Sequence, residues 1–172
     1  MGQRDVERFE RTILPHLDDA YTLARYLLRD EHDAQDVVQD AVLRALRYFE
    51  GYRDGDARAW LLTIERRCCY AWADREGRQA PAMDPDLIEE LPGDTDDPET
   101  EAVRGELRQK LASAVDALPL PFREVIVLRE IQELSYQEIA TVTGVPVGTV
   151  MSRLARARRR LQRALEAQGM ER

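Results

Sequence analysis

Apolar residues recur at helical spacing in successive stretches of the chain. The first covers residues 6–28 and is interrupted by Pro15, which predicts one bent helix or two short ones. The second covers residues 34–49 and repeats at i, i+3, i+4 and i+7 for about four turns. A third helix is expected at about residues 57–75. Its expected buried face holds Trp60 or Leu61, together with Ile64, Cys68, Ala71 and Trp72.

A second group of helices is expected after a long break in this pattern. A helix resumes near Glu99 with Leu107, Leu111, Ala114, Val115 and Leu118 on its apolar face, and it ends at Pro119 and Pro121. Another helix then runs from Phe122 to Ile131. Residues 134–161 follow, and their pattern is typical of a helix-turn-helix, which gives the second group four helices.

Capping, turn chemistry and apolar spacing agree in residues 134–161. Ser135 and Glu138 form a capping box, Gly144 ends the first helix, and Pro146 lies in the turn. The second helix begins near Gly148. Its apolar stripe comprises Val147, Val150, Leu154, Ala157 and Leu161, and its remaining circumference carries Thr149, Ser152, Arg153, Arg156, Arg159, Arg160 and Arg163. An arginine-rich face at a helix N-terminus suits the DNA major groove, although a solvated basic surface looks similar.

The break between the two groups is rich in proline and in acidic residues. We therefore predict an all-α protein with two small helical domains: residues 1–78, an acidic linker at residues 79–98, and residues 99–172. Residues 84–106 carry ten acidic residues against one arginine, whereas residues 146–172 carry seven arginines against two glutamates. The formal net charge of −8 is therefore concentrated in the middle, and it does not argue against a nucleic-acid partner.

Other features of the composition exclude several classes of protein. The N-terminal residues lack a long apolar run, so we expect no membrane insertion and a soluble, cytoplasmic protein. Cys68 and Cys69 are adjacent and rarely pair in a helix, which favours a reducing compartment and two thiols within a helical core. The sequence offers no metal-ligand cluster, no phosphate-binding loop and no catalytic dyad, so we expect no metal, no cofactor and no enzymatic activity.

Two features permit both a structural and a functional interpretation. Asp33 and Asp36 lie in the first turns of the second helix, where acids stabilise the helix dipole, but they could also dock a basic partner. The loop from Phe49 to Asp56 is rich in aromatic residues. These aromatics could close the core, the role that Phe49 suits best, or stack on unpaired bases.

Three blocks occur in this order along the chain: DAQDVVQDAVLRAL (residues 33–46), AWLLTIERRCCYAW (residues 59–72) and the segment 118–161. Together they resemble the sigma-70 family of bacterial initiation factors, in its two-domain extracytoplasmic-function (ECF) type. The chain departs from the family pattern at Glu65 and Arg67, which replace Ala and Asn of an Ala-Arg-Asn triplet, at Ala71, Ala73 and Asp74, and at Met151, where a basic residue is common.

The resemblance implies a role for each surface. The acidic helix would bind the clamp helices of core RNA polymerase through Asp33, Asp36, Gln39 and Asp40. Melted minus-ten DNA would contact Phe49, Tyr52, Arg53, Arg66, Arg67 and Tyr70. The double-stranded minus-thirty-five element would contact Thr149, Ser152, Arg153, Arg156, Arg159 and Arg160. An anti-sigma factor would be a further partner.

Two other functions fit parts of the sequence. A DNA-binding regulator that acts without polymerase would leave the acidic helix and the aromatic loop without a role. A sigma mimic that sequesters an anti-sigma factor would have no use for Arg153, Arg156 and Arg159 on one helix. A separate hypothesis is that the two domains fold together in the free protein and hide both DNA surfaces.

Overall fold

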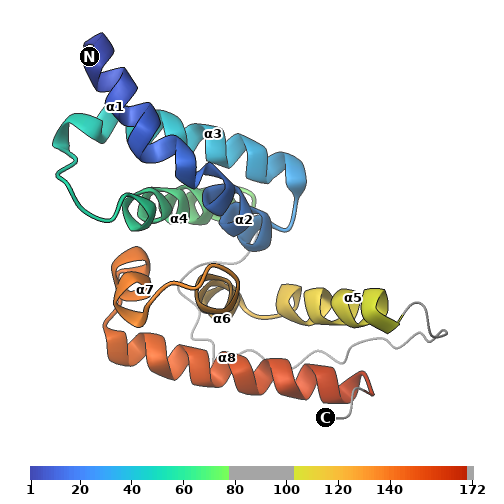
Figure 1. Ribbon diagram of the computed structural model, residues 1–172. Helices are drawn as coiled ribbons and strands as arrows, with labels where there is room; N and C mark the ends of the chain where they lie inside the picture. The colour runs from blue at the N-terminus through green and yellow to red at the C-terminus, as the bar shows by residue number, and fades with distance from the viewer. Residues whose placement is uncertain (78–102, 170–172) are drawn as a thin grey trace.

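The computed structural model describes residues 1–77 and 103–169, and all regular elements in these two ranges are helices (Figure 1). The all-α prediction is confirmed. The predicted linker and the predicted helix start at Glu99 lie outside the described residues. Within the described ranges the helices form an N-terminal and a C-terminal group, which we call the first and the second domain.

Four helices build the first domain. They are α1 (Gln3–Ile13), α2 (Leu17–Leu28), α3 (Glu31–Tyr48) and α4 (Ala57–Arg75). Pro15 lies in a 3₁₀ turn at Leu14–His16, so the first apolar stretch forms two helices and not one bent one. A carboxylate caps the N-terminus of each of the two longest helices of this domain. At α3, Asp30 accepts from the backbone N–H of Asp33 at 2.9 Å, and at α4, Asp56 accepts from the backbone N–H of Ala59 at 3.0 Å.

The buried face of α4 differs from the sequence prediction. Ala71 is exposed, and Trp60, Ile64 and Trp72 are only half-buried. The prediction assumed that α4 packs on one side only, but α4 contacts α2 and α3 on one side and α7 on another. The resulting wide buried surface comprises Ala59, Leu61, Leu62, Glu65, Cys68, Cys69 and Ala73.

The second domain consists of α5 (Val103–Asp116), α6 (Leu120–Ile126), α7 (Tyr136–Thr143) and α8 (Val147–Ala167). A π-helical turn at Val127–Ile131 extends α6. Val150, Leu154 and Ala157 are buried on α8, as the apolar stripe predicts. The prediction for α5 is wrong at Leu107 and Leu111, which are 45% and 42% exposed, because the buried side chains of this helix lie at its C-terminal end, at Ala114 and Val115.

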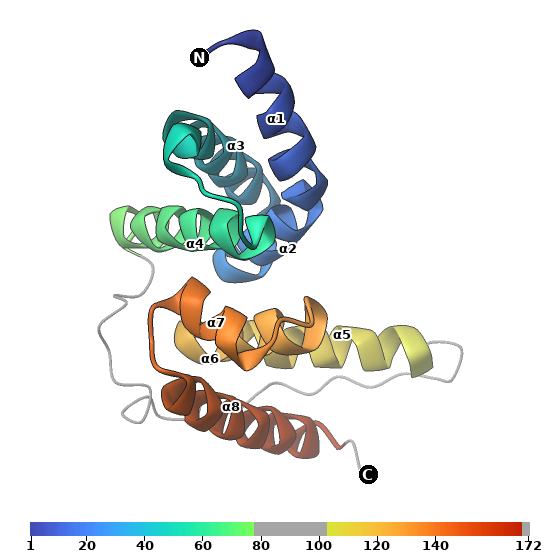
Figure 2. The same cartoon turned by 60° about the vertical axis from the view of Figure 1, so that its left-hand side comes forward.

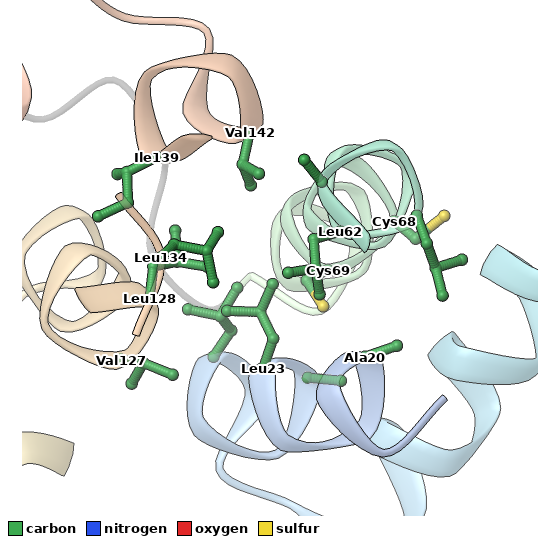
Figure 3. Packing of buried hydrophobic residues seen from close by; sticks show 14 of the residues in the cluster. Ala20, Leu23, Leu62, Cys68, Cys69, Val127, Leu128, Leu134, Ile139 and Val142 are labelled. Carbon is green, nitrogen blue, oxygen red and sulfur yellow. The ribbon is translucent and has the colours of Figure 1, made fainter. Parts of the chain in front are cut away.

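The two domains share one hydrophobic core. Helices α2 and α4 of the first domain lie against α6 and α7 of the second, and α8 lies on the far side of the second domain (Figures 1 and 2). Figure 3 shows Leu23 and Leu62 of the first domain facing Leu128 and Leu134 of the second. All four side chains are fully buried, so the described structure is a closed arrangement of the two domains.

Candidate nucleic-acid interface

The predicted polymerase-binding residues lie on the outer side of α3. Asp36 and Gln39 are exposed, and Asp33 and Asp40 are half-buried. Asp40 accepts a hydrogen bond from Arg44 Nε at 3.0 Å, one turn further along the helix. The N-cap of α3 is Asp30. Asp36 and Gln39 therefore do not cap the helix and remain accessible to a partner.

The aromatic side chains that follow α3 are part of the core. The rings of Phe49 and Tyr52 are stacked with centroids 5.5 Å apart, and Tyr52 lies 5.0 Å from Trp60. Phe49 is 1% exposed and Tyr52 is 7% exposed. The Tyr52 hydroxyl donates to the Gly55 carbonyl at 2.8 Å. The structural interpretation therefore holds for Phe49, and in this conformation neither ring offers a face to a base, whereas Arg53 is exposed.

Arg66 and Tyr70, on α4, meet a carboxylate from the second domain. Glu124, on α6, is fully buried and accepts from Arg66 Nε, from Arg66 Nη2 at 3.4 Å and from the Tyr70 hydroxyl at 2.8 Å. The guanidinium carbon of Arg66 lies 4.2 Å from the centroid of the Tyr70 ring. Arg67 points to solvent. Of the predicted strand-binding residues on α4, only Arg67 is thus exposed.

The electrostatics of this cluster follow from its burial. Desolvation opposes the charge on Arg66, but the neighbouring Glu124 and Tyr70 outweigh it and raise the pKa of Arg66 above its usual value. Desolvation, and then the charge of Glu124, raise the pKa of Tyr70 well above its usual range. Arg66 is therefore charged and Tyr70 neutral at physiological pH. Both groups act as hydrogen-bond donors to an anion.

The helix-turn-helix has the predicted turn and N-cap, but only half of the predicted capping box, because the Glu138 side chain lies against Arg58 and not against the Ser135 backbone. Ser135 Oγ accepts from the Glu138 backbone N–H at 3.1 Å at the start of α7. Gly144 ends α7 with a φ of 72°, in the left-handed region that glycine adopts without strain. Pro146 then occupies the N-cap position of α8. Local sequence signals therefore position α8 relative to α7.

The outer face of α8 is open to solvent. Ser152, Arg156 and Arg159 are exposed, whereas Thr149, Arg153 and Arg160 are half-buried. The Arg160 guanidinium carbon lies 5.1 Å from the centroid of the Phe122 ring. Arg158, which is outside the predicted set, forms a 2.7 Å ion pair with Glu130. The face predicted to enter the major groove therefore lies opposite the buried stripe and remains accessible in the closed arrangement.

The two cysteines are buried side chains of the first domain. Both are free thiols, and burial raises the pKa of Cys68 to about 11 and that of Cys69 well above its usual value. Neither is therefore a reactive thiolate at neutral pH. Residues 1–77 and 103–169 contain no group of three or more potential metal ligands. In the same ranges, no helix combines the length and the apolar character that crossing a membrane requires.

Comparison with known families matches both domains. Residues 12–79 match the family model described as "Sigma-70 region 2", and residues 108–161 match the one described as "Sigma-70, region 4". The ECF RNA polymerase sigma-E factor of Escherichia coli K12 is 38% identical over 134 residues, which cover 73% of this chain and 70% of that protein. The chain belongs to the sigma-70 family, in its ECF type. The first domain is thus its region 2 and the second its region 4.

Further relatives agree with this family. ECF RNA polymerase sigma factor SigE of Mycolicibacterium smegmatis is 32% identical over 160 residues, which cover 93% of this chain and 62% of that longer protein. Among solved structures, RpoE of Bartonella quintana in complex with the anti-sigma factor NepR has a TM-score of 0.71 and 26% identity, covering 93% of this chain and 98% of that one. CnrH in complex with the cytosolic domain of CnrY has a TM-score of 0.66 and 30% identity, covering 92% and 88%.

Sequence reasoning missed the residues that join the two regions. Glu124 belongs to an apolar helix, and Gln132 lies in the turn after it. Gln132 Nε2 donates to the Asp19 carbonyl at 2.6 Å, and Arg123 Nη2 donates to the Leu27 carbonyl at 3.1 Å. One signal in the sequence could have indicated these contacts. Arg123 and Glu124 are charged neighbours within a stretch of otherwise apolar residues, so burying that stretch requires polar partners for both.

Proposed function

We propose that this chain is an alternative sigma factor that binds core RNA polymerase, recognises a two-part promoter and promotes strand opening. The observation that carries the proposal is the match of both sigma-70 regions, in order, together with 38% identity to an ECF sigma factor. In this role the protein catalyses no reaction. Strand opening would draw on the free energy of binding to unpaired bases and to polymerase. The protein would act in the cytoplasm.

The three surfaces take separate parts in this function. Asp33, Asp36, Gln39 and Asp40 would bind polymerase through the outer side of α3. The face of α4 with Arg66, Arg67 and Tyr70 would bind the melted minus-ten strand, together with the exposed Arg53. Phe49 and Tyr52 would support the loop that carries Arg53 from within the core. Helix α8 would read the minus-thirty-five element through Thr149, Ser152, Arg153 and Arg156, and Arg159 and Arg160 would hold phosphates.

An anti-sigma factor is a proposed second partner. RpoE of Bartonella quintana and CnrH, which share the fold of this chain, were each solved in a complex, the former with a named anti-sigma factor. A sigma mimic would bind such a partner and never DNA. The exposed arginine face of α8 supports the sigma factor over the mimic, because a protein that only sequesters a partner does not need it.

Run-off transcription tests the proposal. Purified core polymerase and this chain are incubated with genomic fragments, and the transcript start sites are mapped. Initiation at discrete sites that needs both components is the expected result. DNA binding without initiation would favour a regulator that acts without polymerase, and binding of an anti-sigma factor alone would favour the mimic.

Two matched pairs of variants test the surfaces. Asp36→Lys should abolish binding to core polymerase, whereas Asp18→Lys, at an exposed acid on α2, should leave it unchanged. Arg153→Ala should cost about 1–3 kcal/mol at one base pair of the upstream element if Arg153 contacts a base edge. An equal loss on all sequences would make Arg153 a phosphate contact. Arg108→Ala, at an exposed arginine on α5, is the control.

A further inference from the structure

The closed arrangement buries a carboxylate that has its hydrogen-bond donors in the other domain. Glu124 is fully buried on α6, and its carboxylate accepts from Arg66 and Tyr70 of α4. In the described part of the chain, its own domain gives this carboxylate no hydrogen-bond partner. An ionised carboxylate is costly to bury unless such donors are present. As long as the closed arrangement buries Glu124, its carboxylate therefore depends on Arg66 and Tyr70 of the other domain for its hydrogen bonds.

A second group of polar contacts lies on the same side of α4. Arg58 Nη1 donates to the Gln132 carbonyl at 3.2 Å, and Arg58 Nη2 lies 3.4 Å from Glu138 Oε2. The side chain of Gln132 donates to the carbonyl of Asp19, on α2. The polar contacts therefore run along α4 from Arg58 to Tyr70 and follow the face predicted to hold the DNA strand.

The other two predicted surfaces hold residues that are exposed in the described part of the chain. Asp36 and Gln39 on α3, and Arg156 and Arg159 on α8, are exposed in the closed arrangement. Figures 1 and 2 show α8 on the side of the second domain that faces away from α4. Within the described residues, closure covers Arg66 and Tyr70 on α4 and leaves Arg156 and Arg159 on α8 exposed, so it would hide one of the two predicted DNA surfaces and not both.

We propose that Glu124 competes with single-stranded DNA for the same two hydrogen-bond donors. In the closed chain its carboxylate accepts from Arg66 and Tyr70, and in the open chain a backbone phosphate of the strand would accept from them instead. Carboxylates and phosphates both accept hydrogen bonds from a guanidinium group, so one pair of donors cannot serve both. The closed chain binds duplex DNA through α8 but binds a single strand only after the domains separate. This inference rests on the proposed strand-binding role of α4.

The competition has a measurable consequence. When only a fraction of the molecules is open, the apparent Kd for single-stranded DNA is the intrinsic Kd divided by that fraction. Glu124→Gln removes the charge that the buried donors neutralise, and Gln132→Ala removes a second interdomain hydrogen bond. Both substitutions lie on the second domain, opposite the proposed strand-binding face, and so leave that face unchanged. The control is Glu130→Gln, at an exposed residue that pairs with Arg158 within its own domain.

The experiment compares the full-length wild-type chain, Glu124→Gln, the double variant with Gln132→Ala, and the control. Small-angle X-ray scattering measures the radius of gyration. Fluorescence anisotropy measures the Kd for a labelled, random-sequence single-stranded pool and for the corresponding duplex pool. We expect the radius of gyration to increase, single strands to bind about tenfold more tightly, and duplex binding to stay unchanged. Gln132→Ala alone gives the same direction with a smaller effect if the double variant does not fold.

Two results would overturn the proposal. The first is an unchanged radius of gyration and an unchanged single-strand affinity in both Glu124 variants. The second is expansion without tighter binding of single strands. In that case Arg66→Ala is added to the expanded Glu124→Gln variant, and the single-strand affinity shows whether only the competition fails or the strand-binding role of α4 as well. A weaker affinity would keep α4 as the strand-binding face and reject only the competition, whereas an unchanged affinity would also reject the proposed function of that face.

Discussion

Replacing Glu65 by Gln should remove a pH dependence from the stability of the first domain. The Glu65 carboxyl is fully buried on α4, where Cys69 Sγ lies 3.7 Å from Oε1 and Oε2 has no hydrogen-bond partner among the described residues. Burial is the main reason that the pKa of Glu65 rises to about 8, and the charge of Asp40 adds to it, whereas the hydrogen bond from Cys69 acts in the opposite direction. Glu65 is therefore protonated in the folded protein at neutral pH.

The size of the effect follows from the two protonation equilibria. Because the unfolded chain loses this proton near its ordinary pKa of 4.5, the folded state binds more protons between that value and about 8. The free energy of unfolding therefore falls as pH rises, by up to about 1.4 kcal/mol per pH unit. Between about pH 6 and about pH 8 the wild-type protein should lose about 2 kcal/mol relative to Glu65→Gln, whose amide is neutral throughout.

Urea unfolding followed by circular dichroism at several pH values measures this difference. Glu76→Gln, at an exposed glutamate just after α4, controls for the removal of one carboxyl from the surface. Subtracting the variant from the wild type cancels the titration of the histidines and the other acids. An identical pH slope in the wild type and in Glu65→Gln would refute the reasoning, because it would mean that Glu65 is ionised in the folded protein.

Substitutions at three further sites test the helix-turn-helix by the same urea unfolding. Ser135→Ala removes the acceptor of the Glu138 N–H and should cost about 1 kcal/mol, whereas Ser135→Asn should retain most of the stability. Gly144→Ala forces a side chain into a left-handed conformation and should cost about 1–2 kcal/mol, although the site has space for the added carbon. Leu154→Ala should cost about 2–5 kcal/mol, because Leu154 is 1% exposed in the core of the second domain.

The helix-turn-helix could be predicted from the sequence because its signals are local. The N-cap at Ser135, the glycine at position 144 and the apolar stripe of α8 each act within a few residues, and the structure reproduces them. Only the reciprocal half of the predicted capping box is missing, because the Glu138 side chain lies against Arg58 of the first domain. The same holds for α3, whose apolar spacing gives the buried residues Ala34, Val37, Ala41 and Ala45. The exposed face of each helix is then simply the side opposite its stripe.

The buried face of α4 and the state of its charged residues could not be predicted in this way. A single apolar stripe indicates that a helix packs on one side, but α4 is covered from two sides. Its Glu65 is buried although the residue type favours the surface, and Arg66 is occupied by Glu124, which lies 58 residues away in sequence. Such contacts depend on how the two domains meet, and no short-range pattern encodes that geometry.

The polar cluster at Glu124 also bears on what holds the domains together. A buried ion pair contributes little net stability, because the cost of desolvating both charges offsets their attraction, whereas breaking it by removing one partner is strongly destabilising. The apolar contacts around Leu23, Leu62, Leu128 and Leu134 therefore supply most of the free energy of closure. The pair formed by Arg66 and Glu124 favours instead this particular docking, since another docking that buried Glu124 away from Arg66 and Tyr70 would leave its charge without these donors. An anion that binds Arg66 from solvent would leave the buried Glu124 carboxylate without this donor. It would thus destabilise the closed arrangement by more than the small net free energy that the pair contributes.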